Sequence, residues 1–151
     1  MKLELLFNSP PFSVNSSHYR NGNRTKKCRK WGDQILAQLE QYSDSIDLFR
    51  EQFNKLEHSL ETELIFMYPR EFLFTAQGYI SRRSMDCSNI EKLIIDLIFD
   101  NRFFERDHNN LNLDDTLVTK QTSCKVLSPD NEYKILVRIS IVPLNKDVYK
   151  L

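Results

Sequence analysis

The sequence predicts a mixed α+β fold, in which a small mixed β-sheet packs with helices in one domain. Apolar residues alternate in some segments, as in half-buried strands, and recur at offsets of three and four residues in others, as on one face of a helix. The predicted order is strand, helix, helix, strand, helix, strand, strand, which gives an α+β domain. The length of 151 residues fits one domain.

The first half of the chain supplies four of these elements. Residues 3–7 alternate Leu, Leu and Phe with other residues, so they predict a strand, which Pro10–Pro11 ends. Helical spacing predicts one helix over about residues 25–42 and a second over about 44–57. The next strand is expected over residues 60–68, and a short extended piece over 72–75.

The second half begins with the clearest helix of the chain. Its apolar stripe has offsets 0, 3, 4, 7 and 8, at Ile90, Leu93, Ile94, Leu97 and Ile98. Ser88–Glu91 matches a capping box, which predicts the start of this helix. A polar connection is expected over residues 101–112. Residues 116–127 and 132–143 are then expected to form a β-hairpin around a turn at 128–131.

Composition excludes several classes of protein. The three cysteines, Cys28, Cys87 and Cys124, are an odd number without a CxxC pair, which excludes a disulfide scaffold and a zinc ribbon. No apolar run approaches the ~20 residues of a membrane span, and the N-terminal apolar segment is too short for a signal peptide. We therefore expect a cytoplasmic protein without a membrane partner.

Charge is balanced overall but unevenly distributed. The chain has 21 basic and 21 acidic residues, yet the stretch from His18 to Lys30 contains no acid. Its basic residues are Arg20, Arg24, Lys26, Lys27, Arg29 and Lys30. Such a cluster suits a phosphate backbone. The alternative is an ordinary solvated loop, and composition alone does not decide between them.

Candidate catalytic residues are carboxylates at the junctions between elements. The chain has no GxSxG, GxxxxGK[ST], HExxH or GxGxxG motif. Asp86 precedes the clearest helix, Lys92 lies one turn into it, and Asp114 and Asp115 precede the last two strands. If these carboxylates are close in space, they suit Mg²⁺, which can hold a scissile phosphate and activate water. Lys92 could then reach a phosphate oxygen or the leaving group.

Each of these residues also has a purely structural interpretation. Asp86 can favour the positive end of the helix, and Asp114–Asp115 can form a turn. Lys92 can pair with Asp96 four residues later. The residues alone leave both interpretations open.

Three segments resemble the RusA-type Holliday-junction resolvases. Pro10–Asn15, followed by Tyr19–Arg20, resembles the family's N-terminal PP…N…YR signature. Arg82–Lys92 is similar to its RR-x-D-x-D-N-x-x-K core, and Asp96–Ile98 continues that helix. Leu113–Val118 resembles its D-D-x-x-V element. The three segments occur in the order of the family.

This resemblance implies a small homodimer with a RusA-like domain over residues 1–143 and a tail over 144–151. It implies an endodeoxyribonuclease that depends on Mg²⁺, with Mn²⁺ as a substitute, and that resolves four-way DNA junctions by paired symmetric nicks in recombination and repair. Such enzymes are often encoded by phages or prophages. A two-fold junction needs two equivalent sites, which a symmetric dimer supplies. The helix near 44–57 is interpreted as an insertion.

The resemblance also assigns roles to residues. Asp86 and Asp115 would bind the metal, Asp114 would be an auxiliary acid, and Lys92 would be the catalytic lysine. The basic loop of about residues 13–30 would hold the DNA backbone. Its basic residues, listed above, would be joined there by Arg82 and Arg83.

One position departs from the family pattern. Ser88 stands where the pattern has its second aspartate, so the site loses a negative charge. A serine hydroxyl, directly or through a water, could still fill the coordination position, with weaker metal binding. Two alternatives therefore stay open: a catalytically weak junction-binding protein of the same fold, and an interaction protein that binds no nucleic acid.

Overall fold

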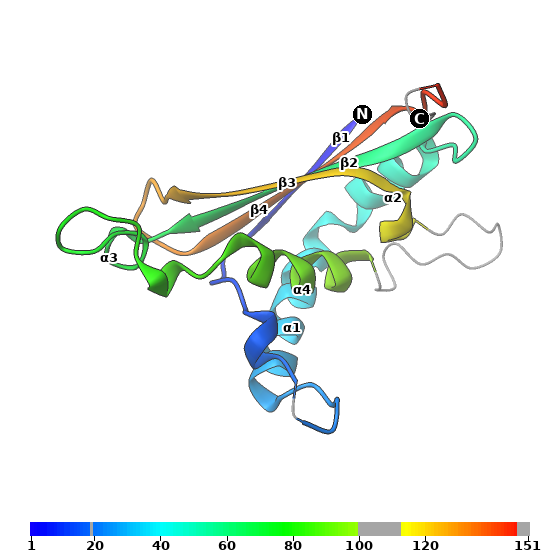
Figure 1. Cartoon of the computed structure of the whole chain (residues 1–151). Coiled ribbons are helices and arrows are strands. Elements are labelled where there is room, and N and C mark those ends of the chain that lie inside the picture. The colour runs from blue at the N-terminus through cyan, green and yellow to red at the C-terminus, as the bar shows by residue number, and fades with distance from the viewer. Residues whose placement is uncertain (19, 100–112, 148–151) are drawn as a thin grey trace.

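The structure of the chain is a computed structural model that describes residues 1–18, 20–99 and 113–147. A four-stranded sheet lies against a layer of helices that covers one of its faces (Figure 1). The main elements are β1 (Lys2–Phe7), α1 (Lys26–Leu39), α2 (Ser43–Gln52), β2 (His58–Tyr68), α3 (Arg70–Leu73), α4 (Cys87–Phe99), β3 (Val118–Leu127) and β4 (Lys134–Pro143). Short 3₁₀ turns are η1 (Val14–Ser16), η2 (Glu40–Tyr42), η3 (Arg82–Ser84) and η4 (Asp115–Leu117).

The sheet has the strand order β1-β4-β2-β3. Strand β4 is antiparallel to both of its neighbours, with Val137 opposite Leu5 on one side and Leu64 on the other. Strand β3 is parallel to β2 and forms one edge of the sheet. The α+β class and the mixed sheet are therefore confirmed. Among the described residues, no helix is long and apolar enough to cross a membrane.

The predicted hairpin of the last two strands is wrong. Both strands exist near the expected positions, but β2 lies between β3 and β4. The connection is tied to the end of β2, because the Ser128 amide donates to the Tyr68 carbonyl at 2.9 Å. The Arg70 amide also donates to the Asn131 side chain at 2.9 Å. These bonds let the connection pass over the end of β2 without closing a two-stranded ladder.

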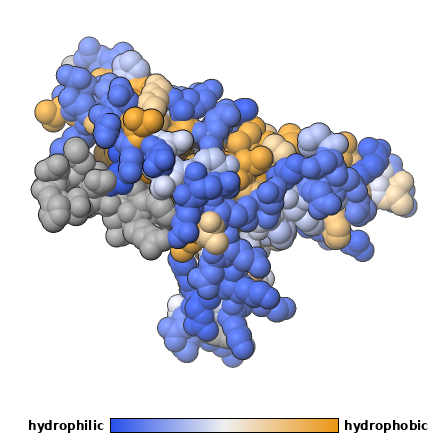
Figure 2. All heavy atoms as spheres, turned by 180° about the vertical axis from the view of Figure 1, so that it is seen from behind, coloured by the Kyte–Doolittle hydropathy of each residue, from blue (hydrophilic) through white to orange (hydrophobic). Residues whose placement is uncertain are grey.

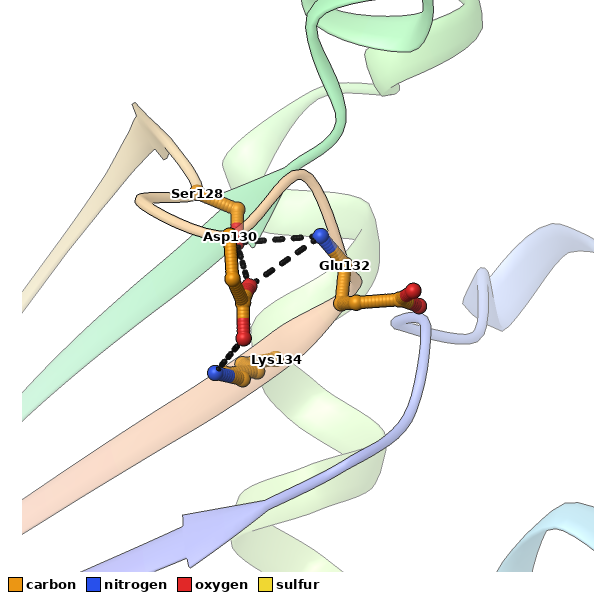
Figure 3. A network of polar contacts seen from close by, with 4 residues as sticks. All are labelled: Ser128, Asp130, Glu132 and Lys134. Carbon is orange, nitrogen blue, oxygen red and sulfur yellow. Dashed lines mark hydrogen bonds and ion pairs between the residues drawn. The ribbon is translucent and has the colours of Figure 1, made fainter.

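The connection between β3 and β4 is also held by its own polar side chains (Figure 3). The Asp130 carboxylate accepts hydrogen bonds from the Ser128 hydroxyl, the Glu132 amide and the Lys134 side chain. The bond from Lys134, followed by the one from Ser128, lowers the pKa of Asp130 from 3.8 to about 2. The turn therefore carries an ionised aspartate over most of the pH range.

The core lies between the sheet and the helices because alternate strand residues face the helical layer. The residues with no exposed surface include Leu5, Phe7, Ile35, Leu39, Ile46, Phe49, Leu64, Phe66, Ile94, Val137 and Ile139. They come from β1, β2 and β4 and from α1, α2 and α4, so burial of one apolar face joins these six elements, whereas the edge strand β3 contributes no fully buried residue. Packing against this core fixes the position of α4 on the sheet, and therefore the place where the helix begins.

The predicted capping box at the start of α4 is wrong. The helix begins at Cys87, so Ser88 is an exposed residue of its first turn. The Glu91 carboxylate turns toward the sheet and accepts a hydrogen bond from the Ser123 hydroxyl at 2.8 Å. The Asp86 carbonyl accepts from the Asn89 amide at 3.0 Å, which places Asp86 at the start of the helix.

Two further boundaries differ from expectation. Helix α2 ends at Gln52, because the chain turns at Asn54, whose amide donates to the His58 ring at 3.0 Å. Half of the extended piece expected at 72–75 belongs to the helical turn α3, whereas Phe74 after it is extended and forms an isolated antiparallel bridge with Ile80. The polar connection expected at 101–112 lies outside the described residues, as do the last four residues of the tail, 148–151.

Candidate functional site

A cavity of about 490 Å³ lies at the start of α4. Its lining comes from three parts of the chain that are far apart in sequence: Ser13 and Asn15 beside η1; Ile80, Ser81, Arg82, Met85, Asp86 and Asn89 around η3 and α4; and Lys125 of β3. The structure thus joins two of the three segments that carry the family resemblance. The cavity is polar at its rim and accessible from solvent, as a site for a charged polymer needs to be.

The N-terminal wall of the cavity is anchored on α1. The Trp31 indole donates to the Pro10 carbonyl at 2.9 Å, and the rings of Trp31 and Phe12 lie 5.8 Å apart. Ser13 then caps η1 by accepting from the Asn15 amide at 3.2 Å. The proline-rich segment therefore serves to hold Ser13 and Asn15 against the cavity.

The opposite wall has an unusual backbone at Met85, directly before Asp86. Met85 has φ of 60° and ψ of 165°, a region that is costly for a residue with a side chain. Lys125 stabilises it, since its ammonium donates to the Met85 carbonyl and to the Ser84 hydroxyl, each at 2.8 Å. The strand thus determines how the chain enters α4 and where Asp86 points.

A buried tyrosine also holds the turn before Asp86, which forms this wall of the cavity. The Tyr68 hydroxyl donates to the Ser84 carbonyl at 2.5 Å, and both residues are buried. Burial raises the pKa of Tyr68 far above its ordinary value, with a smaller contribution from Tyr133. Sequence reasoning missed Tyr68 and Lys125, because an alternating strand pattern does not show that their polar ends meet a distant turn.

Asp86 is exposed at the cavity, as expected of a residue that meets a ligand. Lys92, one and a half turns further along α4, donates to the Asp96 carboxylate at 2.9 Å. This is the ion pair that the structural interpretation of Lys92 expects. Lys92 does not line the cavity, although it lies on the same helix as Asp86.

Asp114 and Asp115 lie at the other end of α4. Strand β3 runs antiparallel to α4. Lys125 contacts Met85, just before the helix begins, and the earlier strand residue Ser123 contacts Glu91, further along the helix. Lys125 lies seven residues beyond Val118, the first residue of β3, so roughly 23 Å of extended strand separates it from η4, which contains Asp115. Figure 1 shows η4 beside the last turns of α4.

The local structure of this acidic pair agrees with its turn interpretation. Asp114 caps η4 by accepting from the Thr116 amide at 2.9 Å. Within one chain, the structure therefore does not bring Asp115 to Asp86. The described residues also contain no group of three or more His, Cys, Asp or Glu side chains that could hold a metal ion. The ligands implied by the resemblance do not fit a magnesium site inside a single chain.

The predicted basic residues lie on two surfaces. Arg82 and Arg83 are exposed on η3, and Arg82 lines the cavity. The six basic residues between positions 20 and 30 are all exposed, on the loop after η1 and on the first turns of α1. Four of them are therefore on α1, which agrees with the helix expected from about residue 25, while Arg20 and Arg24 lie on the loop before it. Tyr19 lies outside the described residues.

The segment that carries the six basic residues forms a projection away from the sheet (Figure 1). It is hydrophilic over almost its whole visible surface (Figure 2). Thr25 closes its base, because the Thr25 amide donates to the Ser17 carbonyl at 2.8 Å and its hydroxyl accepts from the Cys28 amide at 3.2 Å. In sequence, this basic projection comes directly after Ser13 and Asn15, which form the N-terminal wall of the cavity.

No protein-family model matches the chain, and no curated protein matches it.

Proposed function

We propose that the chain is a RusA-type, structure-selective endodeoxyribonuclease that resolves four-way DNA junctions by paired nicks, with Mg²⁺ as cofactor and Mn²⁺ as a substitute. The observation that carries the proposal is the cavity at the start of α4. It unites the proline-rich segment with the segment that contains Arg82, Asp86 and Asn89, two of the three that resemble the family.

The chemistry of the cavity suits a DNA phosphate. Arg82 and Lys125 supply positive charge, and the amides of Asn15 and Asn89 supply neutral donors. The N-terminus of α4, a helix of 13 residues, adds a positive dipole at the same rim. Asp86 is the one carboxylate among the residues that line the cavity, so it would lie beside that phosphate and could supply a single ligand to a metal ion.

The basic projection supports DNA as the polymer. A phosphate backbone is held by arginine and lysine side chains over a surface much larger than one cavity. The exposed residues from Arg20 to Lys30 supply this surface, and Arg83 extends it along η3. Such contacts position a nucleic acid without reading its sequence.

The alternative is a junction-binding protein of the same fold with weak or no cleavage activity. Two observations favour it: Ser88 stands at the position of an expected acid, and Asp115 lies far from Asp86 within one chain. Both reduce the negative charge available to a metal ion at the cavity.

A cleavage assay on synthetic four-way junctions separates the two functions. Wild-type protein should nick the junction with Mg²⁺ or Mn²⁺, and Asp86→Asn should bind it without nicking. Asp44→Asn, which changes an exposed acid on α2, is the matched control and should nick normally. Binding without nicking by the wild type under either metal favours the alternative. Equal affinity for the junction and for linear duplex refutes both.

A further inference from the structure

We infer that the hairpin of residues 74–80, at the rim of the cavity, binds an unpaired DNA base, and that the base stacks on the ring of Tyr79. The inference rests on the proposed function, because it names how the same site would select branched DNA. Unstacking a base costs least where pairing is already interrupted, as at a branch point. A ring beside the phosphate site therefore favours a branched DNA over a linear duplex.

The hairpin leaves and rejoins the chain at the wall of the cavity. Phe74 and Ile80 form an isolated antiparallel bridge, and the Ser81 amide donates to the Leu73 carbonyl at 2.8 Å. Ile80 and Ser81 line the cavity, together with Arg82, which follows them. The hairpin extends beyond the end of β2, beside α3 (Figure 1). A DNA strand with one phosphate in the cavity would therefore pass beside it.

Hydrogen bonds within the hairpin hold it in one conformation. The Thr75 amide donates to the Tyr79 carbonyl at 2.7 Å, and the Tyr79 amide donates to the Thr75 hydroxyl at 3.1 Å. The Gly78 amide donates to the Thr75 carbonyl at 3.0 Å, with a φ of 88° that suits glycine. The Arg70 guanidinium lies 5.6 Å from the centre of the Phe74 ring, at the base of the hairpin. A ring on such a support loses little conformational freedom when it binds.

The side chain of Tyr79 is presented to solvent. Tyr79 is 73% exposed and Ile80 is 58% exposed, so packing within the chain accounts for neither side chain. Aromatic rings are enriched in binding surfaces, because they supply a large contact area with few rotatable bonds. A base can stack on such a ring whatever its identity, since every base has a π face. An exposed tyrosine on a rigid hairpin is therefore suited to a base.

The charges around the hairpin suit a nucleic acid. Residues 72–81 carry no charge, and they lie between Arg70 and Arg82 in sequence. The one acid at this point, Glu71, accepts a hydrogen bond from the Asn131 side chain in the connection between β3 and β4. Single-stranded nucleic acid is bound where basic side chains contact the phosphates and aromatic rings contact the bases. The hairpin and its flanking arginines have this arrangement.

DNA binding tests the role of Tyr79 without any need for cleavage. The wild type should bind a four-way junction more tightly than a linear duplex, and Tyr79→Ala should lose roughly five- to 100-fold in affinity for the junction alone. Tyr79→Phe keeps the ring and should bind like the wild type. Leu56→Ala is the matched control, because Leu56 is 72% exposed and precedes β2, at the end of the strand far from the cavity. Equal junction affinities of Tyr79→Ala and Leu56→Ala would overturn the inference.

A photocrosslink tests the contact itself and separates it from the proposed function. A single strand that contains 5-iododeoxyuridine should crosslink to Tyr79 on irradiation, as located by peptide mass spectrometry. A crosslink to Tyr79 in a protein that binds junction and duplex equally would refute the proposed function, while the base contact would stand. Crosslinks found only outside residues 74–83 would overturn the base contact. Binding of the wild type but not of Tyr79→Ala to vesicles of anionic lipid would also overturn it, because the ring would then belong to a membrane site.

Discussion

The Lys125 ammonium donates a 2.8 Å hydrogen bond to the carbonyl of Met85, the residue directly before Asp86. The two residues are 40 positions apart in sequence, and one lies on the edge strand while the other lies in the turn before α4. Met85 has a positive φ that residues with side chains rarely adopt. The direction in which Asp86 enters the cavity is therefore held by the sheet as much as by its own helix.

The first prediction tests this support. Lys125→Met keeps most of the aliphatic side chain but removes both hydrogen bonds, so the free energy of unfolding should fall by about 1–2 kcal/mol. Urea denaturation measures it. Lys120→Met, an exposed lysine on the same strand, should stay within about 0.5 kcal/mol of wild type. Equal losses in the two variants would show that the contact to Met85 does not stabilise the turn.

The second prediction concerns alkaline pH. Burial, aided by Tyr133, raises the pKa of Tyr68 above its ordinary value of 10.0. The folded state therefore keeps a proton that the unfolded state loses. The stability from this difference is complete below about pH 10 and is lost as the pH rises through the folded pKa. Tyr68→Phe should destabilise the protein at neutral pH and lessen its loss of stability above pH 10.

Chemical denaturation at a series of pH values measures this dependence. Tyr79→Phe is the matched control, because Tyr79 is 73% exposed. It should reproduce the wild-type pH profile. If the Tyr68→Phe profile were as steep as that of the wild type above pH 10, ionisation of Tyr68 would not be the cause.

The third prediction concerns acidic pH and the turn of Figure 3. The pKa of Asp130 is lowered to about 2, first by the hydrogen bond from Lys134. Stability from this carboxylate is present above its unfolded pKa near 4 and is lost as the pH falls toward 2. In Lys134→Met, the Asp130 titration midpoint seen by carboxyl NMR should rise toward 3.8. Lys120→Met should leave it unchanged, and an unmoved midpoint in Lys134→Met would contradict the assignment.

The fourth prediction follows from the placement of Arg82 at the cavity. Arg82→Gln should weaken junction binding. The slope of log K against log salt concentration should also become shallower, by the amount expected for the loss of about one phosphate contact. Fluorescence anisotropy over a range of salt concentrations measures both quantities. Lys55→Gln, an exposed charge removed far from the cavity, should keep the wild-type slope. A slope that changes equally in both variants would show a general charge effect without a specific contact.

The strands and helices themselves were easier to predict from the sequence than the way in which they pair and pack in space. Strand and helix periods are local, so β1, β2, α1 and α4 were found from apolar spacing alone. Strand pairing is not local, and the short connection between β3 and β4 suggested a hairpin, although its backbone bonds go to the end of β2. The Ser88–Glu91 pattern failed for the same reason, because the partner of Glu91 is Ser123.

The candidate site was predictable only in part. The motif resemblance singled out Arg82, Asp86 and the segment with Asn15, which the structure brings to one cavity. It also singled out Asp115, which the fold of one chain places elsewhere. The contribution of Lys125 was missed, since a lysine in a polar strand resembles an ordinary surface residue until its tertiary contact is known.

The central claim, that DNA binds at the start of α4, is tested most directly by NMR of the isotope-labelled full chain. A four-way junction is added, and shifts of backbone amides are compared across the molecule. We predict the largest shifts at Asn15, Arg82, Asp86 and Asn89, continuing into the basic residues at the start of α1. Shifts confined to the open face of the sheet around Lys2 and Arg138, or none at all, would contradict the account.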